Sequence, residues 1–327
     1  MNGSVGAGVD EFELIRRHLA ALGATRSDVV LGPGDDAALV QAPPGRQLAM
    51  TMDTVLAGRH FPHDLPADSV GHRALAVNLS DLAAMGAEPA WALMSLAMPS
   101  ADETWLAEFA QGLGDLARRF DVAVAGGDLV QGPLAVSIQL TGFAPARGAL
   151  RRDGARVGDE VWVSGALGGA MAALEGGLEE TRVRDPGLHA RFAAPQPRVN
   201  LGRELVGIAS SAIDVSDGLA ADLLHVLDAS GVGAAVRSED VPVDPGASGY
   251  LSSARALELA LSGGDDYELC FTAPPDRADA VREAASSCDL QVSRIGYCVA
   301  GTGLSITAGG RSLVLKGKGW NHFGAGQ

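Results

Sequence analysis

The chain has 327 residues, enough for one large domain or two of ordinary size, and 47% of them are hydrophobic, which excludes a disordered or fibrous protein. Its 40 acidic side chains outnumber 25 basic ones, and the formal charge of −15 argues against a nucleic-acid partner. The lysines, Lys316 and Lys318, both lie near the C-terminal end, so the interior lysine of a P-loop or a protein kinase is missing.

The sequence predicts a cytoplasmic protein without a membrane partner. No segment approaches the roughly 18 consecutive apolar residues that a membrane span requires. The first residues lack the basic and apolar regions of a signal peptide. Cys270, Cys288 and Cys298 show no CxxC spacing and are typical of reduced thiols.

Helices and strands alternate in the first half. Apolar residues at helical spacing and short apolar runs predict, in chain order, a helix over 12–22, a strand over 48–53, a helix over 68–85, a strand over 91–98, a helix over 105–120, and strands over 122–125 and 134–143. Asn78 and Asp81 share one face of the second of these helices.

A glycine- and arginine-rich stretch between Pro145 and Asp159 is typical of a domain junction, which predicts domains 1–147 and 148–327. The second half alternates again: a strand over 161–164, a turn over 165–169, a helix to about 174, a loop over 186–197, a strand over 212–215, a helix over 219–227 and a strand over 267–272. Alternation in both halves predicts an α/β (α+β) fold of two domains.

Several aspartates lie at predicted strand ends, in glycine-flanked turns, or on the polar face of an apolar helix: Asp36, Asp53, Asp81, Asp128, Asp214 and Asp217. Isolated buried carboxylates are costly, and few cations are near them in sequence. Mg²⁺ takes oxygen ligands and is commonly held by a few carboxylates together with substrate phosphates. The pattern therefore predicts Mg-nucleotide chemistry without a Walker motif.

Simpler interpretations exist for each motif taken alone. Aspartate beside glycine is the usual composition of a turn, Asp217 could be a helix N-cap, and Asp81 could be a solvated helix residue. The glycine-rich turn over 165–169 does not match the GxGxxG spacing, although a phosphate at the following helix remains an alternative. His60 and His63 have no nearby cysteine, which argues against zinc. The magnesium hypothesis depends on the recurrence of the motifs.

Seven segments, read together, carry a family resemblance. They are GPGDD at 32–36, DTVLAGRHF at 53–61, AVNLSDLAAMG at 76–86, GGD at 126–128, IDVSDG at 213–218, SGGDDYEL at 262–269 and GWNHF at 319–323. Over nearly its whole length the chain resembles bacterial thiamine-monophosphate kinase, of the ATP-binding superfamily of aminoimidazole ribonucleotide synthetase. The segments at 53–61, 263–269 and 319–323 are specific to the kinase, whereas the others are shared more loosely.

The resemblance implies ATP-dependent phosphorylation of thiamine monophosphate to thiamine diphosphate, by direct in-line transfer with several Mg²⁺ ions and no covalent nucleophile. It implies Mg²⁺ ligands at Asp36, Thr51, Met52, Asp53, Asp81, Asp128, Asp214 and Asp217. It implies ATP contacts at Gly127, Asp128, Arg152 and Ser216, and contacts with the thiamine substrate at His60, Asp266 and Trp320. It also implies a homodimer in which the N-terminal domains build a shared barrel-like sheet.

Three points stay open at the level of sequence. The family usually has a hydroxyl residue where Met52 stands, so a ligand there would act through its backbone carbonyl. Either Asp265 or Asp266 could face the substrate. The alternatives in function are another superfamily member, of the selenophosphate synthetase or hydrogenase-maturation type, and a non-catalytic Mg-nucleotide-binding relative. A selenophosphate synthetase should carry a reactive Cys or selenocysteine and a Lys near the N-terminus. A hydrogenase-maturation enzyme should end in a Cys, where this sequence has Gln327.

Overall fold

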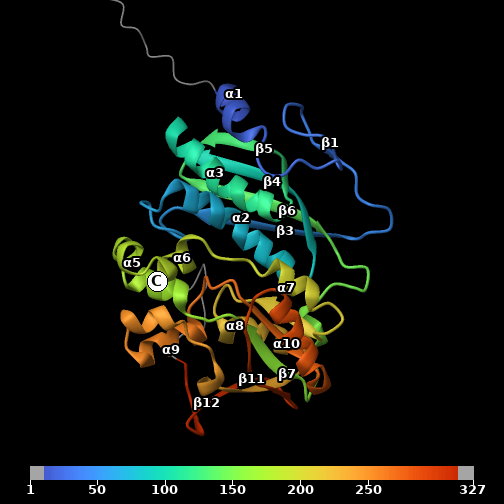
Figure 1. Cartoon of the computed structure of the whole chain (residues 1–327), viewed down its shortest axis with the longest axis vertical. Coiled ribbons are helices and arrows are strands. Elements are labelled where there is room, and N and C mark those ends of the chain that lie inside the picture. The colour runs from blue at the N-terminus through green and yellow to red at the C-terminus, as the bar shows by residue number, and fades with distance from the viewer. Residues whose placement is uncertain (1–10, 316–327) are drawn as a thin grey trace, which may run out of the picture. The chain divides into compact units, whose positions relative to one another are not determined.

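The computed structural model describes residues 11–315, and the chain divides into two compact units. Unit 1 comprises Met1–Asn78 and Pro89–Phe143, and unit 2 comprises Leu79–Glu88 and Ala144–Gln327. Each unit is built on its own β-sheet (Figure 1). In the part of the chain that the structure describes, no helix is both long and apolar enough to cross a membrane.

Unit 1 contains a four-stranded sheet in the order β3-β6-β4-β5 and a separate pair of short strands. Its elements are α1 (Glu11–Leu14), β1 (Val29–Leu31), β2 (Leu39–Val40), β3 (Leu48–Leu56), α2 (Ala67–Ala84), β4 (Glu88–Met98), α3 (Glu103–Arg119), β5 (Ala123–Gln131) and β6 (Ala135–Phe143), with the last six residues of α2 belonging to unit 2. β3 pairs antiparallel with β6, and β4 pairs parallel with β5.

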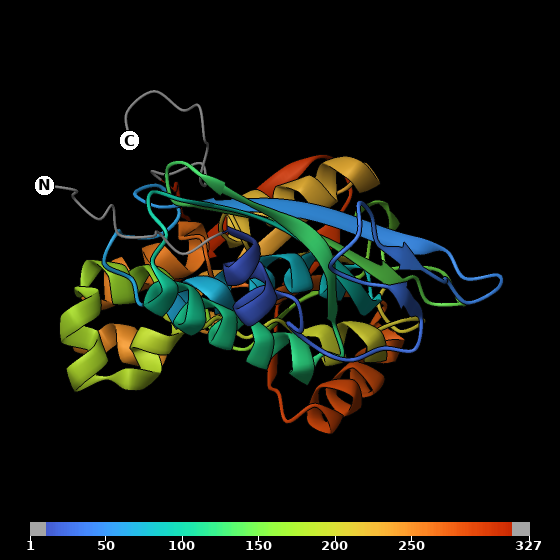
Figure 2. The same ribbon diagram turned by 90° about the horizontal axis from the view of Figure 1, so that it is seen from above.

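Helices α2 and α3 cover one face of the four-stranded sheet (Figures 1 and 2). The side chain of Asp102 caps α3 by accepting the Trp105 N–H at 3.0 Å, and the apolar stripe that includes Phe109 and Leu113 is fully buried. Burial alternates along β3 because successive side chains point to opposite faces. Met50 and Met52 are 66% and 64% exposed, so the second face of the sheet carries apolar side chains in solvent.

Unit 2 contains a seven-stranded sheet in the order β13-β12-β9-β11-β7-β10-β8. Its elements are β7 (Glu160–Ser164), α4 (Gly169–Glu175), α5 (Leu178–Arg184), α6 (Pro186–Ala193), α7 (Val199–Glu204), β8 (Ser211–Asp214), α8 (Leu219–Ser230), β9 (Gly233–Arg237), α9 (Ser253–Ser262), β10 (Leu269–Ala273), α10 (Ala278–Ser287), β11 (Val292–Val299), β12 (Gly303–Ala308) and β13 (Arg311–Ser312).

The two faces of this sheet follow from the alternation of β7. Val161 and Val163 join the apolar core that α8 completes. Trp162, between them, points to the other face, where the Arg282 guanidinium of α10 lies 5.4 Å from the ring centroid. Helices therefore cover both faces, and the central strands β7 and β10 are buried along their whole length.

One sequence prediction about an element was wrong, and another gave a helix that is too long. The predicted loop over 186–197 contains helix α6, which begins at Pro186 with the Asp185 carboxylate accepting the Leu188 N–H at 2.9 Å. Proline is favoured at the first helical position, where its missing N–H costs nothing. The predicted helix over 12–22 is short: α1 runs into a π-helical turn over Ile15–Leu19, in which Ala20 N–H donates to the Ile15 carbonyl at 2.8 Å.

Candidate functional site

Three segments of unit 2 meet at one edge of its sheet. β10 lies between β7 and β8 and runs antiparallel to both, so the C-terminal ends of β7 and β8 and the N-terminal end of β10 share this edge. Beyond the strands, the Asp265 N–H donates to the Ser216 carbonyl at 2.9 Å, and the Tyr267 N–H donates to the Val215 carbonyl at 2.8 Å. The segments at 213–218 and 262–269 are thus held side by side.

Asp214 is a buried carboxylate with a second carboxylate near it. The side chain is 4% exposed, and the Ser80 hydroxyl donates to its Oδ2 at 2.8 Å. Burial and the negative charge of Asp81 raise the pKa of Asp214 to about 8, against the opposing effects of the Ser80 hydrogen bond and the positive charge of Arg152. Unit 2 therefore brings together three predicted site residues, Asp81, Arg152 and Asp214.

The loop that carries Ser216 and Asp217 is held by a residue that the sequence analysis missed. Oδ2 of Asp222, in the first turn of α8, accepts the N–H groups of Ser216, Asp217 and Gly218 at 3.0, 3.0 and 3.1 Å. Burial raises the pKa of Asp222 to about 7, although these amide bonds act in the other direction. The signal in the sequence was an acidic residue in the first turn after a glycine, which is typical of helix capping.

The adjacent aspartates at 265 and 266 make different contacts. The Asp266 carboxylate accepts the Gly168 N–H at 2.7 Å and the Ala170 N–H at 3.5 Å, at the start of α4. Burial raises the pKa of Asp266 well above its usual value. Oδ1 of Asp265 instead accepts the hydroxyl of Tyr267 at 2.9 Å. The structure thus engages Asp266 with backbone amides, whereas the Asp265 contact is made by a side chain of the same turn.

A buried ion pair supports this edge of the sheet. Glu268 is 1% exposed, and its carboxylate accepts two hydrogen bonds from the Arg198 guanidinium and one, at 2.6 Å, from the Ser164 hydroxyl. A Cβ on Gly165 would lie 2.1 Å from Oε1 of Glu268, and Gly165 has φ +58°. Glycine is therefore required at this turn both by its conformation and by the close approach of Glu268.

Unit 1 places a second group of predicted residues on β3 and after it. Thr51 and Asp53 point to the face that packs on the helices, and the Asp53 N–H donates to Oδ1 of the fully buried Asn78 at 3.1 Å. Met52 points to the opposite face, so its side chain does not lie with theirs. Nδ1 of His60, in the turn that follows β3, accepts the Leu56 N–H at 3.0 Å.

The remaining predicted residues of unit 1 lie apart from β3. Gly127 and Asp128 are on β5, which β6 and β4 separate from β3 in the sheet. A Cβ on Gly127 would lie 1.9 Å from the Met94 carbonyl oxygen, so close strand packing requires glycine there. Asp36 is exposed between β1 and β2, where its N–H donates to the Asp35 carboxylate at 2.8 Å.

Within residues 11–315, no group of three or more His, Cys, Asp or Glu side chains is placed to hold a metal ion. The predicted metal ligands are instead divided between the units: Asp36, Thr51, Met52, Asp53 and Asp128 in unit 1, and Asp81, Asp214 and Asp217 in unit 2. Trp320 lies outside the described residues.

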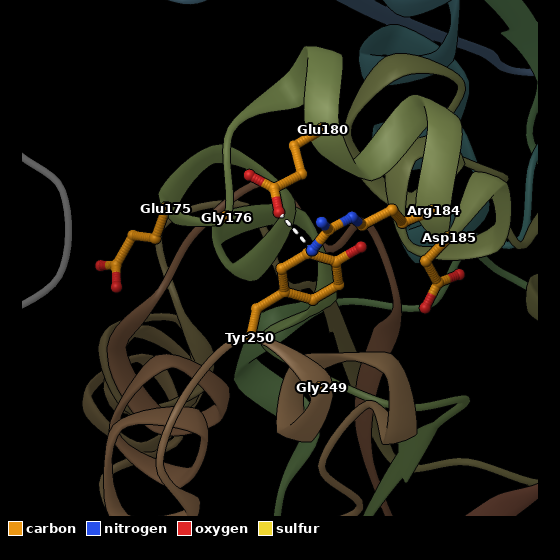
Figure 3. Close-up of a pocket in the computed structure, with 7 residues that line it drawn as sticks. All are labelled: Glu175, Gly176, Glu180, Arg184, Asp185, Gly249 and Tyr250. Carbon is orange, nitrogen blue, oxygen red and sulfur yellow. Dashed lines mark ion pairs between the residues drawn. The ribbon is translucent and has the colours of Figure 1, made fainter.

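A cavity of about 600 Å³ in unit 2 contains none of the predicted site residues (Figure 3). It is lined by Glu175, Gly176, Glu180, Arg184, Asp185, Gly249 and Tyr250. Its charged groups already have partners in the fold: Arg184 pairs with Glu180 at 2.8 Å, Glu175 pairs with Arg255, and Asp185 caps α6. We therefore assign it no part in the site.

Comparisons with known proteins identify the family of the chain. Residues 34–144 match the family described as AIR synthase related protein, N-terminal domain, and residues 156–309 match its C-terminal domain. The thiamine-monophosphate kinase of Escherichia coli strain K12 is 41% identical over 96% of this chain and 98% of its own length.

Two solved structures are also similar. The thiamine-monophosphate kinase from Stenotrophomonas maltophilia is 44% identical with a TM-score of 0.82, covering 88% of this chain and 93% of that one. The structure described as AaThiL complexed with AMPPCP and TMP is 31% identical with a TM-score of 0.76, covering 86% and 89%. On its length, motifs and two matched domains, the chain belongs to the thiamine-monophosphate kinase family, with the two-domain α/β fold of the AIR synthase-related proteins.

Proposed function

We propose that this chain transfers the γ-phosphoryl group of ATP to thiamine monophosphate, giving thiamine diphosphate and ADP. The observation that carries the proposal is the 41% identity to a thiamine-monophosphate kinase over nearly the full length of both chains. The relative solved with AMPPCP and TMP together supports the same pair of substrates. The proposal also places the reaction in the cytoplasm.

The chemistry of Asp214 fits a divalent cation. Two carboxylates, Asp81 and Asp214, lie close enough that one raises the pKa of the other, and burial adds to that effect. Mg²⁺ is commonly held through one or two carboxylates, with waters and substrate phosphates completing its shell, so a cluster of three protein ligands is not required. When bound, the metal would neutralise phosphate charge as the two anionic substrates approach.

The proposal keeps the other metal and ATP assignments that the family resemblance implies. Asp36, Thr51, Asp53, Asp128 and Asp217 complete the set of metal ligands, and Gly127, Asp128, Arg152 and Ser216 contact ATP. Met52 would act through its backbone carbonyl, because its side chain points to the face opposite Thr51 and Asp53. Asp222 accepts the amides of the loop at 216–218 and so holds the backbone that carries Ser216.

On the thiamine side, we assign the charge-balancing carboxylate to Asp265. The Asp266 carboxylate accepts hydrogen bonds from the amides of Gly168 and Ala170 at the start of α4, so its role there is structural. A carboxylate beside the positively charged thiazolium ring offsets its charge, and an aromatic ring such as that of Trp320 can stack on it. His60 is the remaining residue of this group.

Transfer of this kind needs no covalent nucleophile. The accepting phosphate oxygen of thiamine monophosphate is ionised at neutral pH, so a strong general base is unnecessary. Phosphoryl transfer depends mainly on positioning and on electrostatic stabilisation. The two loops at the edge of the unit 2 sheet are held by direct backbone hydrogen bonds, which supports a fixed arrangement of Ser216 and Asp265.

We propose that the domain boundary lies at 147/148. We also propose a homodimer in which the unit 1 sheets form a shared barrel-like sheet. Along β3 the outward side chains Leu48, Met50, Met52 and Leu56 are 45%, 66%, 64% and 37% exposed. Among the described strands β3 pairs with β6 on one side only and forms an edge of its sheet. A long apolar edge strand is usually covered, and a second copy of the chain supplies a matching surface.

The test is ADP release from ATP and Mg²⁺ with and without thiamine monophosphate, with identification of thiamine diphosphate as the product. We expect turnover only with the monophosphate. Asp128→Asn should lower turnover by on the order of 10²-fold or more through loss of a metal ligand, whereas Asp115→Asn, at an exposed surface pair, should not. Turnover with a different acceptor would identify another superfamily member, and nucleotide binding without turnover would identify a non-catalytic relative.

A further inference from the structure

The turn at 263–267 has an unusual backbone. Asp265 has φ +68° and Tyr267 has φ +51°, in the left-handed region that non-glycine residues rarely adopt. The hydrogen bonds from the two amides of these residues to the carbonyls of Ser216 and Val215 hold the turn in place. Strained backbone that persists under such restraint is concentrated at functional sites.

The strained conformation directs three consecutive side chains to different contacts. Asp266, the middle residue, turns towards the amide of Gly168 at 2.7 Å. Asp265 and Tyr267, on either side of it, are brought together, and the Tyr267 hydroxyl donates to Oδ1 of Asp265 at 2.9 Å. Tyr267 is 8% exposed, so its ring is fixed by packing and its hydroxyl is presented at a defined point.

We propose that Tyr267 is a positioning residue for the acceptor substrate: its hydroxyl fixes the Asp265 carboxylate in the orientation that faces the cationic ring of thiamine monophosphate. This rests on the proposed function and on the assignment of Asp265 made above. A carboxylate that can rotate freely loses entropy when a cation binds, whereas one already oriented does not. The contribution of Tyr267 is therefore specific to the acceptor and does not extend to ATP.

The experiment is steady-state kinetics of the full-length enzyme, varying each substrate while the other is saturating. The variants are Tyr267→Phe, which keeps the ring and removes the hydroxyl, Asp265→Asn, and the double variant. Tyr297→Phe is the matched control, because that tyrosine is 43% exposed on β11. Melting temperatures are measured on the four variants and on the unmodified protein.

We expect Tyr267→Phe to raise the KM for thiamine monophosphate about tenfold, the typical effect of losing one hydrogen bond to a charged group. The KM for ATP and the melting temperature should stay close to those of the unmodified protein. Asp265→Asn should have a larger effect on the acceptor, and the double variant should resemble Asp265→Asn alone, since the hydroxyl acts through that carboxylate. Tyr297→Phe should change nothing.

Additive effects of the two substitutions would overturn the proposal. So would an equal loss toward both substrates accompanied by a lower melting temperature, because that is the signature of a purely structural tyrosine. A Tyr267→Phe enzyme with unchanged acceptor kinetics, beside an active parent, would refute the role of Tyr267 and leave the proposed function intact. Absence of turnover with thiamine monophosphate in the parent enzyme would refute both.

Discussion

Asp265 and Asp266 are adjacent aspartates with different contacts, from which we infer a substrate-binding role for Asp265 and a structural role for Asp266. Asp266→Ala would leave the Gly168 N–H without its acceptor at the start of α4. We expect it to lower the free energy of unfolding by about 1–3 kcal/mol, the cost of an unsatisfied buried amide. Urea denaturation measures this. Asp265→Asn is the matched comparison and should keep its stability, so a stable Asp266→Ala protein that has lost only acceptor binding would contradict the assignment.

Asp28 provides a pH-dependent contribution to stability that is separate from the site. The Arg26 guanidinium donates two hydrogen bonds to its carboxylate, at 2.7 and 2.9 Å, and the Trp91 indole donates a third at 2.9 Å. The Arg26 hydrogen bond, more than the opposing effect of burial, holds the pKa of Asp28 below its ordinary value of 3.8. A lowered folded-state pKa stabilises the protein above the ordinary value, and that stabilisation is lost as the pH falls through the folded-state pKa.

We therefore expect Asp28→Asn to reduce the free energy of unfolding by about 1–3 kcal/mol at pH 7, the cost of hydrogen bonds to a charged group. The gap between variant and parent should narrow as the pH falls below about 4, the ordinary range of an aspartate. Urea denaturation between pH 7 and pH 3 measures it. Asp115→Asn, at an exposed pair, should give no such gap. A gap independent of pH would show that shape, rather than charge, matters at position 28.

At the scale of elements, helix α8 is linked to the loop before it by the hydrogen bonds of Asp222. Asp222→Ala removes the common acceptor of three consecutive amides. Because several amides would be left unsatisfied, we expect the free energy of unfolding to fall by more than about 2 kcal/mol. Because the same loop carries Ser216 and Asp217, the KM for ATP should rise as well. Denaturation and kinetics on one preparation measure both.

The control for this substitution lies on the same helix. Asp228 is exposed near the C-terminal end of α8, and Asp228→Ala should change stability by no more than about 0.5 kcal/mol, as surface substitutions usually do. Loss of stability without any change in the KM for ATP would separate the capping role of Asp222 from the binding of nucleotide.

The elements could be predicted from sequence where periodicity was strong, as for the apolar stripe of α3 that contains Phe109 and Leu113. Prediction failed where one residue type has two uses. Pro186 was interpreted as part of a loop, but it opens α6 behind the cap of Asp185. Local signals for helix starts are real, yet the sequence does not show whether a proline ends one element or begins the next.

The candidate site could be predicted as a set of residues but not as an arrangement. Local pattern identifies Asp214, at a predicted strand end, and Asp217, before Gly218. The order of β7, β10 and β8, in contrast, depends on long-range pairing that no local pattern encodes. The same limit explains why the choice between Asp265 and Asp266 stayed open. Their directions depend on the left-handed turn and on the amides of α4, more than 90 positions away along the chain.

At the scale of the whole molecule, we propose that copies of the chain associate through the outward face of β3. Met50 and Met52 point into solvent from adjacent outward positions, and we propose that a second copy covers them. Replacing both with aspartate would place unpaired charges in that interface, where burial without partners is costly. We therefore expect Met50→Asp/Met52→Asp to sediment as a 33.4 kDa monomer, and the parent protein at twice that mass.

The control must be an apolar side chain that is equally exposed but lies outside the proposed interface. Val183, on α5 of unit 2, is 73% exposed, and Val183→Asp should leave the sedimentation unchanged. Circular dichroism on each variant separates dissociation from unfolding. If the parent protein sediments as a monomer, or if the double variant stays dimeric, the β3 face is not the interface. The four exposed apolar side chains of β3 would then need another partner, because an uncovered apolar edge strand favours aggregation.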